Sequence, residues 1–125
     1  MRKLLTPLLA LPLLALAATA AQAMDPAKVM TTDAGAVLTD ANGMTLYTFD
    51  KDGAGMSACY DQCAQAWPPV AAPEGVSGDW SAVERKDGIR QLAYKGQPLY
   101  LWVKDTKPGD VTGDGFKDVW HVAKP

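Results

Sequence analysis

Apolar and polar residues alternate in short runs along the first half of the chain, and turn-forming residues separate the runs. Residues 35–49 contain two such runs on either side of Asn42-Gly43, the dipeptide most typical of a tight β-turn. This pattern predicts a β-hairpin. Along its second arm, the strand period of two places Tyr47 and Phe49 on the same face.

The second half of the chain repeats this pattern. Residues 80–84 and 89–94 flank a Lys-Asp-Gly turn, which predicts another hairpin. A Gly-containing turn then leads into residues 98–103, where apolar and aromatic residues alternate as in a strand. Residues 119–122 predict a short closing strand.

One short segment between these β-rich regions has helical character. Residues 58–67 are predicted to form a short helix or wound turn, which Pro68-Pro69 ends because neither residue can donate a backbone hydrogen bond. We therefore expect a mostly β protein. It is predicted to be a small antiparallel β domain built from two hairpin-containing repeats, at about 35–73 and 80–125, with a short helical turn at the cysteines.

A sequence motif occurs once in each predicted repeat. Residues 46–52 and 99–105 both read Leu-Tyr-x-aromatic-x-Lys-Asp, and such self-similarity marks two copies of one structural unit. The motif aromatics are Tyr47, Phe49, Tyr100 and Trp102. They form either the aromatic core of a small domain or an exposed platform for a sugar, a quinone-like ring or a cationic ligand. The exposure of the rings distinguishes these two interpretations.

The motif acids, Asp52 and Asp105, follow the aromatics at the same spacing in both copies. We expect these carboxylates to cap turns or to pair with Lys51 and Lys104. They are not expected to act as a general acid and base, because no sequence feature raises the pKa of one above that of the other. The sequence contains one histidine and neither a nucleophile motif nor a phosphate-binding loop. No catalytic residues are predicted, and a non-enzymatic role is favoured.

The first 23 residues have the pattern of a cleavable signal peptide. Arg2 and Lys3 precede an apolar run, and an Ala-x-Ala cleavage site follows it. Cleavage would leave residues 24–125 as a single domain with no stable membrane span. Its first residues, 24–33, are expected to be a frayed lead-in. The predicted location is periplasmic or secreted.

The charge of the mature chain argues against some classes of partner. The whole sequence carries 12 Lys and Arg against 14 Asp and Glu, so without Arg2 and Lys3 the balance is 10 against 14, a net charge of −4. An acidic chain without a basic stripe is not expected to bind nucleic acid or anionic lipid. The predicted partner is an envelope protein or a small ligand, which the sequence does not identify.

The chain has two cysteines, Cys59 and Cys63, and in an exported protein this pair predicts a structural disulfide. Side chains four apart on an ideal helix have Cβ atoms about 5–6 Å apart, whereas a disulfide requires about 3.5–4.5 Å. The bond therefore implies an irregular turn. The alternative is a thiol-redox or metal site, although the spacing is one residue longer than the Cys-x-x-Cys of thioredoxin-like proteins.

A loop rich in glycine and aspartate, residues 110–118, resembles calcium-binding loops in which oxygen-bearing residues alternate around a sharp glycine turn. The predicted calcium ligands are Asp110, Thr112, Asp114 and Asp118, with the carbonyl oxygen of Phe116. The other interpretation is a solvated Asp-Gly turn. Calcium is the single cofactor that this pattern suggests.

A copper site is the remaining metal hypothesis. The single histidine, His121, and the methionines Met30, Met44 and Met56 supply imidazole and thioether groups, and free cysteines would supply thiolates. Soft sulfur ligands suit Cu(I). The methionines, however, lack the tight spacing of a copper-binding motif.

These features together resemble one known family. The paired Tyr-x-aromatic-x-x-Asp motifs, the segment from Cys59 to Pro69 and the Asp-Thr-Lys-Pro-Gly-Asp run at 105–110 are similar to the bacterial secreted-repeat family, which groups predicted lipoproteins with a Y-x-[FWY]-x-x-D motif. This resemblance implies an exported bacterial domain of unknown function and supplies no catalytic residues. No cysteine follows the signal-like segment directly, so the lipid anchor implied by the lipoprotein label lacks its acceptor.

Two functional hypotheses follow. The first is a non-catalytic exported domain that binds an unidentified ligand or partner. The alternative is a periplasmic thiol-redox or metal-handling protein, in which Cys59 and Cys63, His121 or the loop at 110–118 would carry the chemistry.

Overall fold

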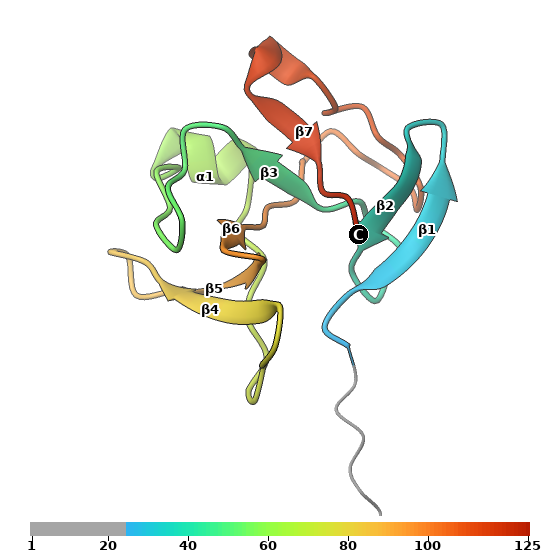
Figure 1. Cartoon of the computed structure of the whole chain (residues 1–125). Coiled ribbons are helices and arrows are strands. Elements are labelled where there is room, and N and C mark those ends of the chain that lie inside the picture. The colour runs from blue at the N-terminus through green and yellow to red at the C-terminus, as the bar shows by residue number, and fades with distance from the viewer. Residues whose placement is uncertain (1–24) are drawn as a thin grey trace, which may run out of the picture.

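The computed structural model describes residues 25–125, and the predicted signal peptide at 1–23 lies outside the described residues. Within them, short antiparallel strands form three small sheets, β1-β2, β3-β7 and β4-β5-β6 (Figure 1). The elements are β1 (Lys28–Thr32), β2 (Gly35–Thr39), β3 (Tyr47–Phe49), α1 (Gln62–Ala66), β4 (Trp80–Glu84), β5 (Arg90–Tyr94), β6 (Gln97–Pro98), the short 3-10 turn η1 (Phe116–Asp118) and β7 (Trp120–Val122). The prediction of a mostly β, antiparallel domain is confirmed.

The first predicted hairpin is wrong in its pairing. β2 pairs with β1, from Lys28↔Thr39 to Thr32↔Gly35, so part of the expected frayed lead-in is a strand. Most β1 residues are exposed or half-buried, which is why no apolar alternation revealed it. Gly35 has φ +87° at the end of the turn, a conformation that glycine adopts without steric cost.

Asn42-Gly43 does turn the chain, as predicted, but a long hairpin does not follow it. The Gly43 N–H donates to the Asp40 carbonyl at 3.0 Å, and one bridge, Thr39↔Thr45, lies beyond the turn. β3 instead pairs with β7 from the other end of the chain. The turn residues predict that the chain reverses direction, but they do not determine which strand pairs with β3.

The second predicted hairpin is confirmed. β4 and β5 pair in antiparallel register from Trp80↔Tyr94 to Glu84↔Arg90. The predicted strand at 98–103 is shorter than expected, because β6 ends at Pro98. Beyond it, Tyr100 makes isolated bridges to Tyr47 and Pro69. The predicted closing strand is present as β7.

The two halves of the domain, residues 28–72 and 80–124, exchange their C-terminal segments. At the end of the first half, Val70 accepts a hydrogen bond from the Leu92 N–H at 2.7 Å. At the end of the second half, Ala123 accepts one from the Leu38 N–H at 2.9 Å, which places the C-terminus beside β2 (Figure 1). Each half therefore completes the sheet of the other.

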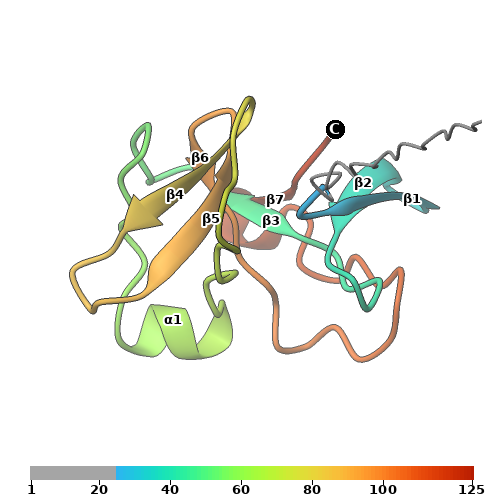
Figure 2. The same cartoon turned by 90° about the horizontal axis from the view of Figure 1, so that it is seen from below.

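Two buried clusters lie along this shared interior. One contains leucines from both halves, Leu38, Leu46, Leu92 and Leu99. The other is aromatic and is described below. The hairpins β1-β2 and β4-β5 lie at opposite ends, with β3 and β7 between them (Figure 2). Among residues 25–125, no helix combines the length and the apolar character that crossing a membrane requires.

α1 lies inside the predicted helical segment, and Cys59 forms a disulfide with Cys63, as predicted. The helix is a single short stretch. Its last turn closes with a hydrogen bond from the Trp67 N–H to the Cys63 carbonyl at 2.8 Å, and Pro68-Pro69 prevents the helix from continuing. The disulfide and the prolines lie on either side of the short helix that leads into Trp67.

Candidate functional site

The two motif tyrosines meet at the centre of the domain. Tyr47 and Tyr100 are completely buried. The Tyr47 N–H donates to the Tyr100 carbonyl at 2.8 Å, and the Tyr100 N–H donates back to the Tyr47 carbonyl at 2.9 Å. This reciprocal pair relates the two halves by an approximate two-fold axis.

Each tyrosine hydroxyl binds the motif acid of the opposite half. The Tyr47 hydroxyl donates to Asp105 Oδ2 at 2.6 Å, and the Tyr100 hydroxyl donates to Asp52 Oδ2 at 2.7 Å. The motif is therefore not a local unit. Its tyrosine and its aspartate each need the partner copy.

The protons of these pairs stay on the phenols. Burial, reinforced by the hydrogen bond to Asp105, raises the pKa of Tyr47 far above its usual value. Burial also raises the pKa of Tyr100, and the Asp52 carboxylate adds to this effect. Burial raises the pKa of Asp52 as well, although the hydrogen bonds from Tyr100 and the Ala58 N–H oppose it. Neither pair is suited to proton transfer near neutral pH.

The second oxygen of each motif acid caps a loop, in agreement with the predicted turn-capping role. Asp52 Oδ1 accepts the Ala58 N–H at 2.8 Å. Asp105 Oδ1 accepts the Thr112 N–H at 3.0 Å and the Thr112 hydroxyl at 2.6 Å. The expected ion pairs with the neighbouring lysines do not occur among the salt bridges of residues 25–125, because both carboxylates point inward.

Four aromatic rings stack into a column that alternates between the halves. Its order is Phe49, Trp120, Trp67, Trp102, with ring centroids 4.1, 3.8 and 3.9 Å apart. The central pair, Trp67 and Trp120, is nearly parallel at 2°. Tyr47 meets Trp67 edge-on at 5.2 Å, and Tyr100 meets Trp120 in the same way at 5.1 Å. We call these four rings the aromatic column.

Burial of the motif rings favours the core interpretation over the exposed platform. Tyr47 and Tyr100 are 0% exposed, Trp67 and Trp120 are 3% exposed and Trp102 is 8% exposed, while Phe49 is half-buried. Trp67 and Trp120 were not part of the predicted motif set. They occupy equivalent places in the two halves, and the alignment of the repeats beyond the motif is the signal that would have found them.

Part of the column borders a depression of about 340 Å³ between α1 and η1. Three rings of the column, Trp67, Trp102 and Trp120, line it together with Cys63, Phe116 and Lys117. We call this feature the tryptophan depression. It lies where the two halves meet, because α1 belongs to the first half and η1 to the second.

The wall formed by the second half is closely packed and conformationally strained. A Cβ atom on Gly113 would lie 2.7 Å from Trp67 Cη2 and 3.0 Å from Trp102 Cδ1, so only glycine fits beneath the column. Lys117 and Asp118 have φ of 53° and 61°. The left-handed region is uncommon for residues other than glycine and costs of order 1 kcal/mol per residue.

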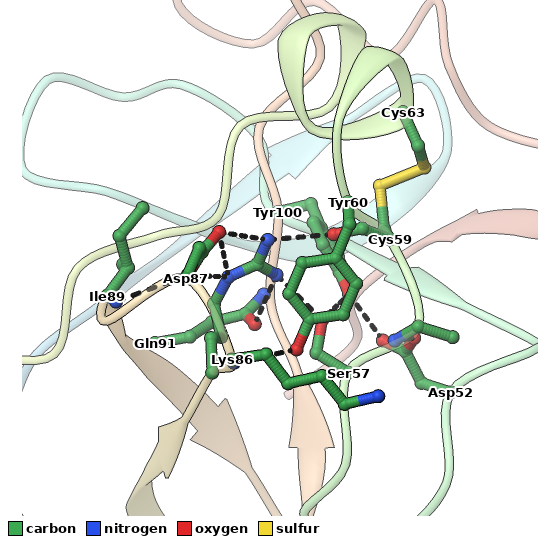
Figure 3. Close-up of polar contacts among 12 residues, drawn as sticks. Asp52, Ser57, Cys59, Tyr60, Cys63, Lys86, Asp87, Ile89, Gln91 and Tyr100 are labelled. Atoms are coloured by element: carbon green, nitrogen blue, oxygen red, sulfur yellow. Dashed lines mark hydrogen bonds and ion pairs between the residues drawn. A yellow bond between two sulfur atoms is a disulfide. The ribbon is translucent and has the colours of Figure 1, made fainter.

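A second polar cluster surrounds Arg85 (Figure 3). No motif in the sequence predicted it. The buried Arg85 guanidinium donates to Asp87 at 2.8 Å, to Ser57 Oγ at 2.7 Å and to the Cys59 carbonyl at 2.8 Å. Ser57 Oγ in turn lies 2.5 Å from the Tyr100 hydroxyl. The cluster therefore ties β4 to the disulfide loop and to the Tyr100–Asp52 pair.

The charges of this cluster are matched. The hydrogen bond from Arg85 lowers the pKa of Asp87. Burial alone would lower the pKa of Arg85, but the hydrogen bond and charge of Asp87 outweigh it and raise that pKa. In the sequence, Arg85 stands among charged residues beside a turn, where a solvated surface is the ordinary expectation. No local signal marks it as buried.

The structure does not bring the predicted calcium ligands together. Asp110 pairs with Lys107 at 2.7 Å, and the hydrogen bonds from Lys107 and from the Thr106 N–H lower the pKa of Asp110 to about 2. Thr112 binds Asp105, and Asp114 accepts the Val122 N–H at 3.0 Å. Within residues 25–125, no three His, Cys, Asp or Glu side chains are grouped to hold a metal ion.

The copper hypothesis loses its thiolate ligands in this structure, because both cysteines are in the disulfide. His121 Nε2 lies 2.9 Å from Asp50 Oδ2 in an exposed pair on the β3-β7 sheet. Met56 is 67% exposed. These residues do not form a site with the cysteines.

The model of one protein family, described as a secreted repeat of unknown function, matches the chain twice, at residues 28–71 and 81–124. The chain belongs to this secreted repeat family. The two matches coincide with the halves that exchange their C-terminal segments, and the first match includes β1. No curated protein and no solved structure matches the chain. Membership of the secreted repeat family and the disulfide indicate an exported domain of unknown function.

Proposed function

We propose that this secreted repeat protein is a non-catalytic binding domain whose small ligand presents a flat, apolar ring to the tryptophan depression. The observation that carries this proposal is that three of the four stacked rings, all indoles, line one depression that is open to solvent. The three indoles are 3–8% exposed, so their edges and the half-buried Phe116 ring form a small, rigid apolar floor. A planar ring is the chemical group that complements it.

The size of the depression supports a small ligand. Its volume of about 340 Å³ is at the lower end of the range for small-molecule sites, roughly 300–1,000 Å³. It also lies at the junction of the two halves, between α1 and η1. A ligand bound there would contact both halves at once.

Lys117 favours a neutral or anionic ring over a cation. It is the single charged residue that lines the depression, and its ammonium lies 5.5 Å from the Phe116 ring. Aromatic sites bind quaternary ammonium groups through the negative faces of their rings, and a nearby positive charge weakens that attraction. A lysine at the rim repels such a ligand and attracts a carboxylate or phenolate.

Calorimetric titration with three naphthalene probes tests the proposal. The probes are 2-naphthoate, 2-naphthylmethanol and a naphthyl trimethylammonium salt. At about 0.3 kcal/mol per non-hydrogen atom, a probe of about 13 such atoms would bind with a Kd of order 1 mM. We expect naphthoate to bind most tightly and the cation least. Absence of heat with both naphthoate and naphthylmethanol at millimolar concentrations would contradict the proposed function.

The matched variants are Lys117→Gln and Lys51→Gln. Both lysines are exposed, but only Lys117 lines the depression. Loss of an exposed charge interaction should weaken naphthoate binding about two- to five-fold in Lys117→Gln and leave naphthylmethanol unchanged. Lys51→Gln should bind every probe like the parent chain. Equal weakening in both variants would place the probes elsewhere on the surface.

A second candidate function, thiol-disulfide exchange, is supported by the position of Cys63. This residue lines the tryptophan depression, whereas Cys59 is completely buried. An external dithiol would attack the Cys63 sulfur, and two electrons and two protons would pass to the cysteines as the dithiol becomes a disulfide.

Partial reduction with dithiothreitol, followed by alkylation and mass spectrometry, tests this alternative. A redox role requires a bond that glutathione-like potentials reduce in the folded protein. A bond that stays oxidised until the protein unfolds has a structural role only.

A further inference from the structure

Several central contacts of this domain connect its two halves. Both tyrosine–aspartate bonds pair a donor of one half with an acceptor of the other. In the aromatic column, each central tryptophan stacks on rings of the opposite half. The C-terminal segments are also exchanged. A half without its partner would expose its largest apolar side chains.

We infer that a second copy of this chain can supply the missing half, so that two chains exchange halves and form a closed, two-fold symmetric dimer. Every contact listed above would be retained, because none depends on the covalent connection between the halves. The partner that this interior surface fits is therefore another copy of the same protein.

The connection between the halves has the properties of a hinge. It comprises residues 73–79, which are exposed apart from the half-buried Val76, and projects beyond β4 in Figure 1. Gly75 and Gly78 have φ of 78° and 68°, so the loop already depends on glycine conformations. It contributes little to either buried cluster.

The length of this connection determines whether one chain can close on itself. Ala72 bonds to Arg90 on one edge of β5, and Trp80 pairs with Tyr94 on the other edge. At about 3.3 Å per residue along the strand and about 4.8 Å between strands, the connection must span roughly 16 Å. Deletion of residues 74–78 would leave three Cα steps, at most about 11 Å. The shortened chain could not dock its own halves.

The intact chain should be monomeric at ordinary concentrations. A short flexible connection gives the tethered half an effective concentration of the order of millimolar. A second copy competes only when its concentration approaches that value during folding. Exchange is therefore expected after refolding at about 1 mM protein and not after refolding at micromolar concentration.

The decisive experiment uses the full chain with residues 74–78 deleted, analysed by light scattering after size-exclusion chromatography. We expect twice the monomer mass, with the near-ultraviolet circular dichroism of the parent chain, because the aromatic column is reassembled between chains. In the control, Gly and Ser replace residues 74–78 at the same length, and this chain should remain monomeric. A folded monomer of the shortened chain would overturn the inference.

A second measurement applies even if the shortened chain does not fold. Unlabelled and nitrogen-15-labelled intact chains are unfolded, mixed and refolded at about 1 mM, and native mass spectrometry is applied to the products. Exchange predicts dimers of mixed label with native circular dichroism, which dissociate only on unfolding. Exclusive recovery of monomers at this concentration would contradict the inference.

Discussion

The two copies of the motif make the same hydrogen bond in different surroundings. The Tyr100–Asp52 pair continues through Ser57 to the buried Arg85 guanidinium. Within residues 25–125 no cation contacts the Tyr47–Asp105 pair in this way, and the Gly113 N–H donates to the Tyr47 hydroxyl at 3.2 Å. Tyr100 is supported by a charged cluster, and Tyr47 by a backbone N–H of the opposite half. The central bond is shared, while the residues around it differ.

The walls of the tryptophan depression differ in the same way. In the first half, the disulfide anchors α1 beneath Trp67. In the second half, close packing of Gly113 and two left-handed residues hold η1 under Trp102 and Trp120. A covalent bond and a tightly packed turn thus fix equivalent segments. This comparison predicts which changes affect the two halves equally and which affect only one.

The largest expected effect is shared by the halves. Trp67→Ala and Trp120→Ala each remove a central ring of the aromatic column, and loss of a buried tryptophan costs about 3–5 kcal/mol of unfolding free energy. Urea unfolding measures both. Trp80→Ala is the control, because Trp80 packs outside the column, tilted against Tyr94, and is half-buried; its effect should be smaller. A cost below about 1 kcal/mol in either column variant would contradict a shared core.

Removal of the two tyrosine hydroxyls should have unequal effects on the unfolding free energy. Tyr47→Phe leaves Asp105, which is 7% exposed, with an unpaired buried oxygen and should cost about 1–3 kcal/mol. Tyr100→Phe should cost less, because Asp52 is half-exposed and Ser57 keeps its bond to Arg85. Urea unfolding compares the two with Tyr94→Phe, whose hydroxyl has no hydrogen bond among the described residues. The reverse order would mean that the Arg85 cluster matters more than burial.

Local signals in the sequence identified most elements but not their partners. The β4-β5 turn, the helical segment ended by Pro68 and the disulfide all depend on residues close together in the chain, and all three were predicted. The pairing of β3 with β7 and the exposed strand β1 were not. Those features depend on contacts between distant segments, which no local period records.

In the candidate site, too, the residues were predicted but the contacts between distant segments were not. The motif residues were found because they repeat, and the repeat predicted two equivalent units. The crossed bonds between Tyr47 and Asp105 and between Tyr100 and Asp52 were not predicted. The sequence places Lys51 and Lys104 directly beside these aspartates, and those lysines were the expected partners. Arg85 was missed because its burial depends on Ser57 and Cys59, which the fold brings from a distant segment of the chain.

The disulfide should stabilise only the first half's wall of the depression. Closing a loop this short is worth about 2 kcal/mol in the chain-entropy model, so Cys59→Ala combined with Cys63→Ala should lower the unfolding free energy by about that amount. Near-ultraviolet circular dichroism should still report the aromatic column. Adding a reductant should destabilise the parent chain and not the variant. A variant that loses the aromatic signal would show that the disulfide supports the column itself.

The smallest expected effect is a difference in pH dependence between two carboxylates of the Arg85 cluster. The hydrogen bond from Arg85 lowers the pKa of Asp87, so its contribution to stability is present above an ordinary aspartate pKa, about 3.9, and is lost as the pH falls through the folded-state value. Burial raises the pKa of Asp52. Its contribution has the opposite sign: it is present below about pH 3.9 and is lost as the pH rises through the folded-state value.

Urea midpoints measured between about pH 3 and 7 distinguish these two contributions. Each substitution also raises or lowers the midpoint at every pH, so the comparison uses the slope of the midpoint against pH. Asp87→Asn should flatten the decline on the acid side. Asp52→Asn should flatten a decline as the pH rises from about 4, and the double variant should lack both. If both single variants flattened the same limb, the two carboxylates would titrate as one network through Ser57 and Tyr100. The Tyr100–Asp52 pair would then differ from the Tyr47–Asp105 pair through its electrostatic coupling to Arg85 and Asp87, and not through the burial of its carboxylate.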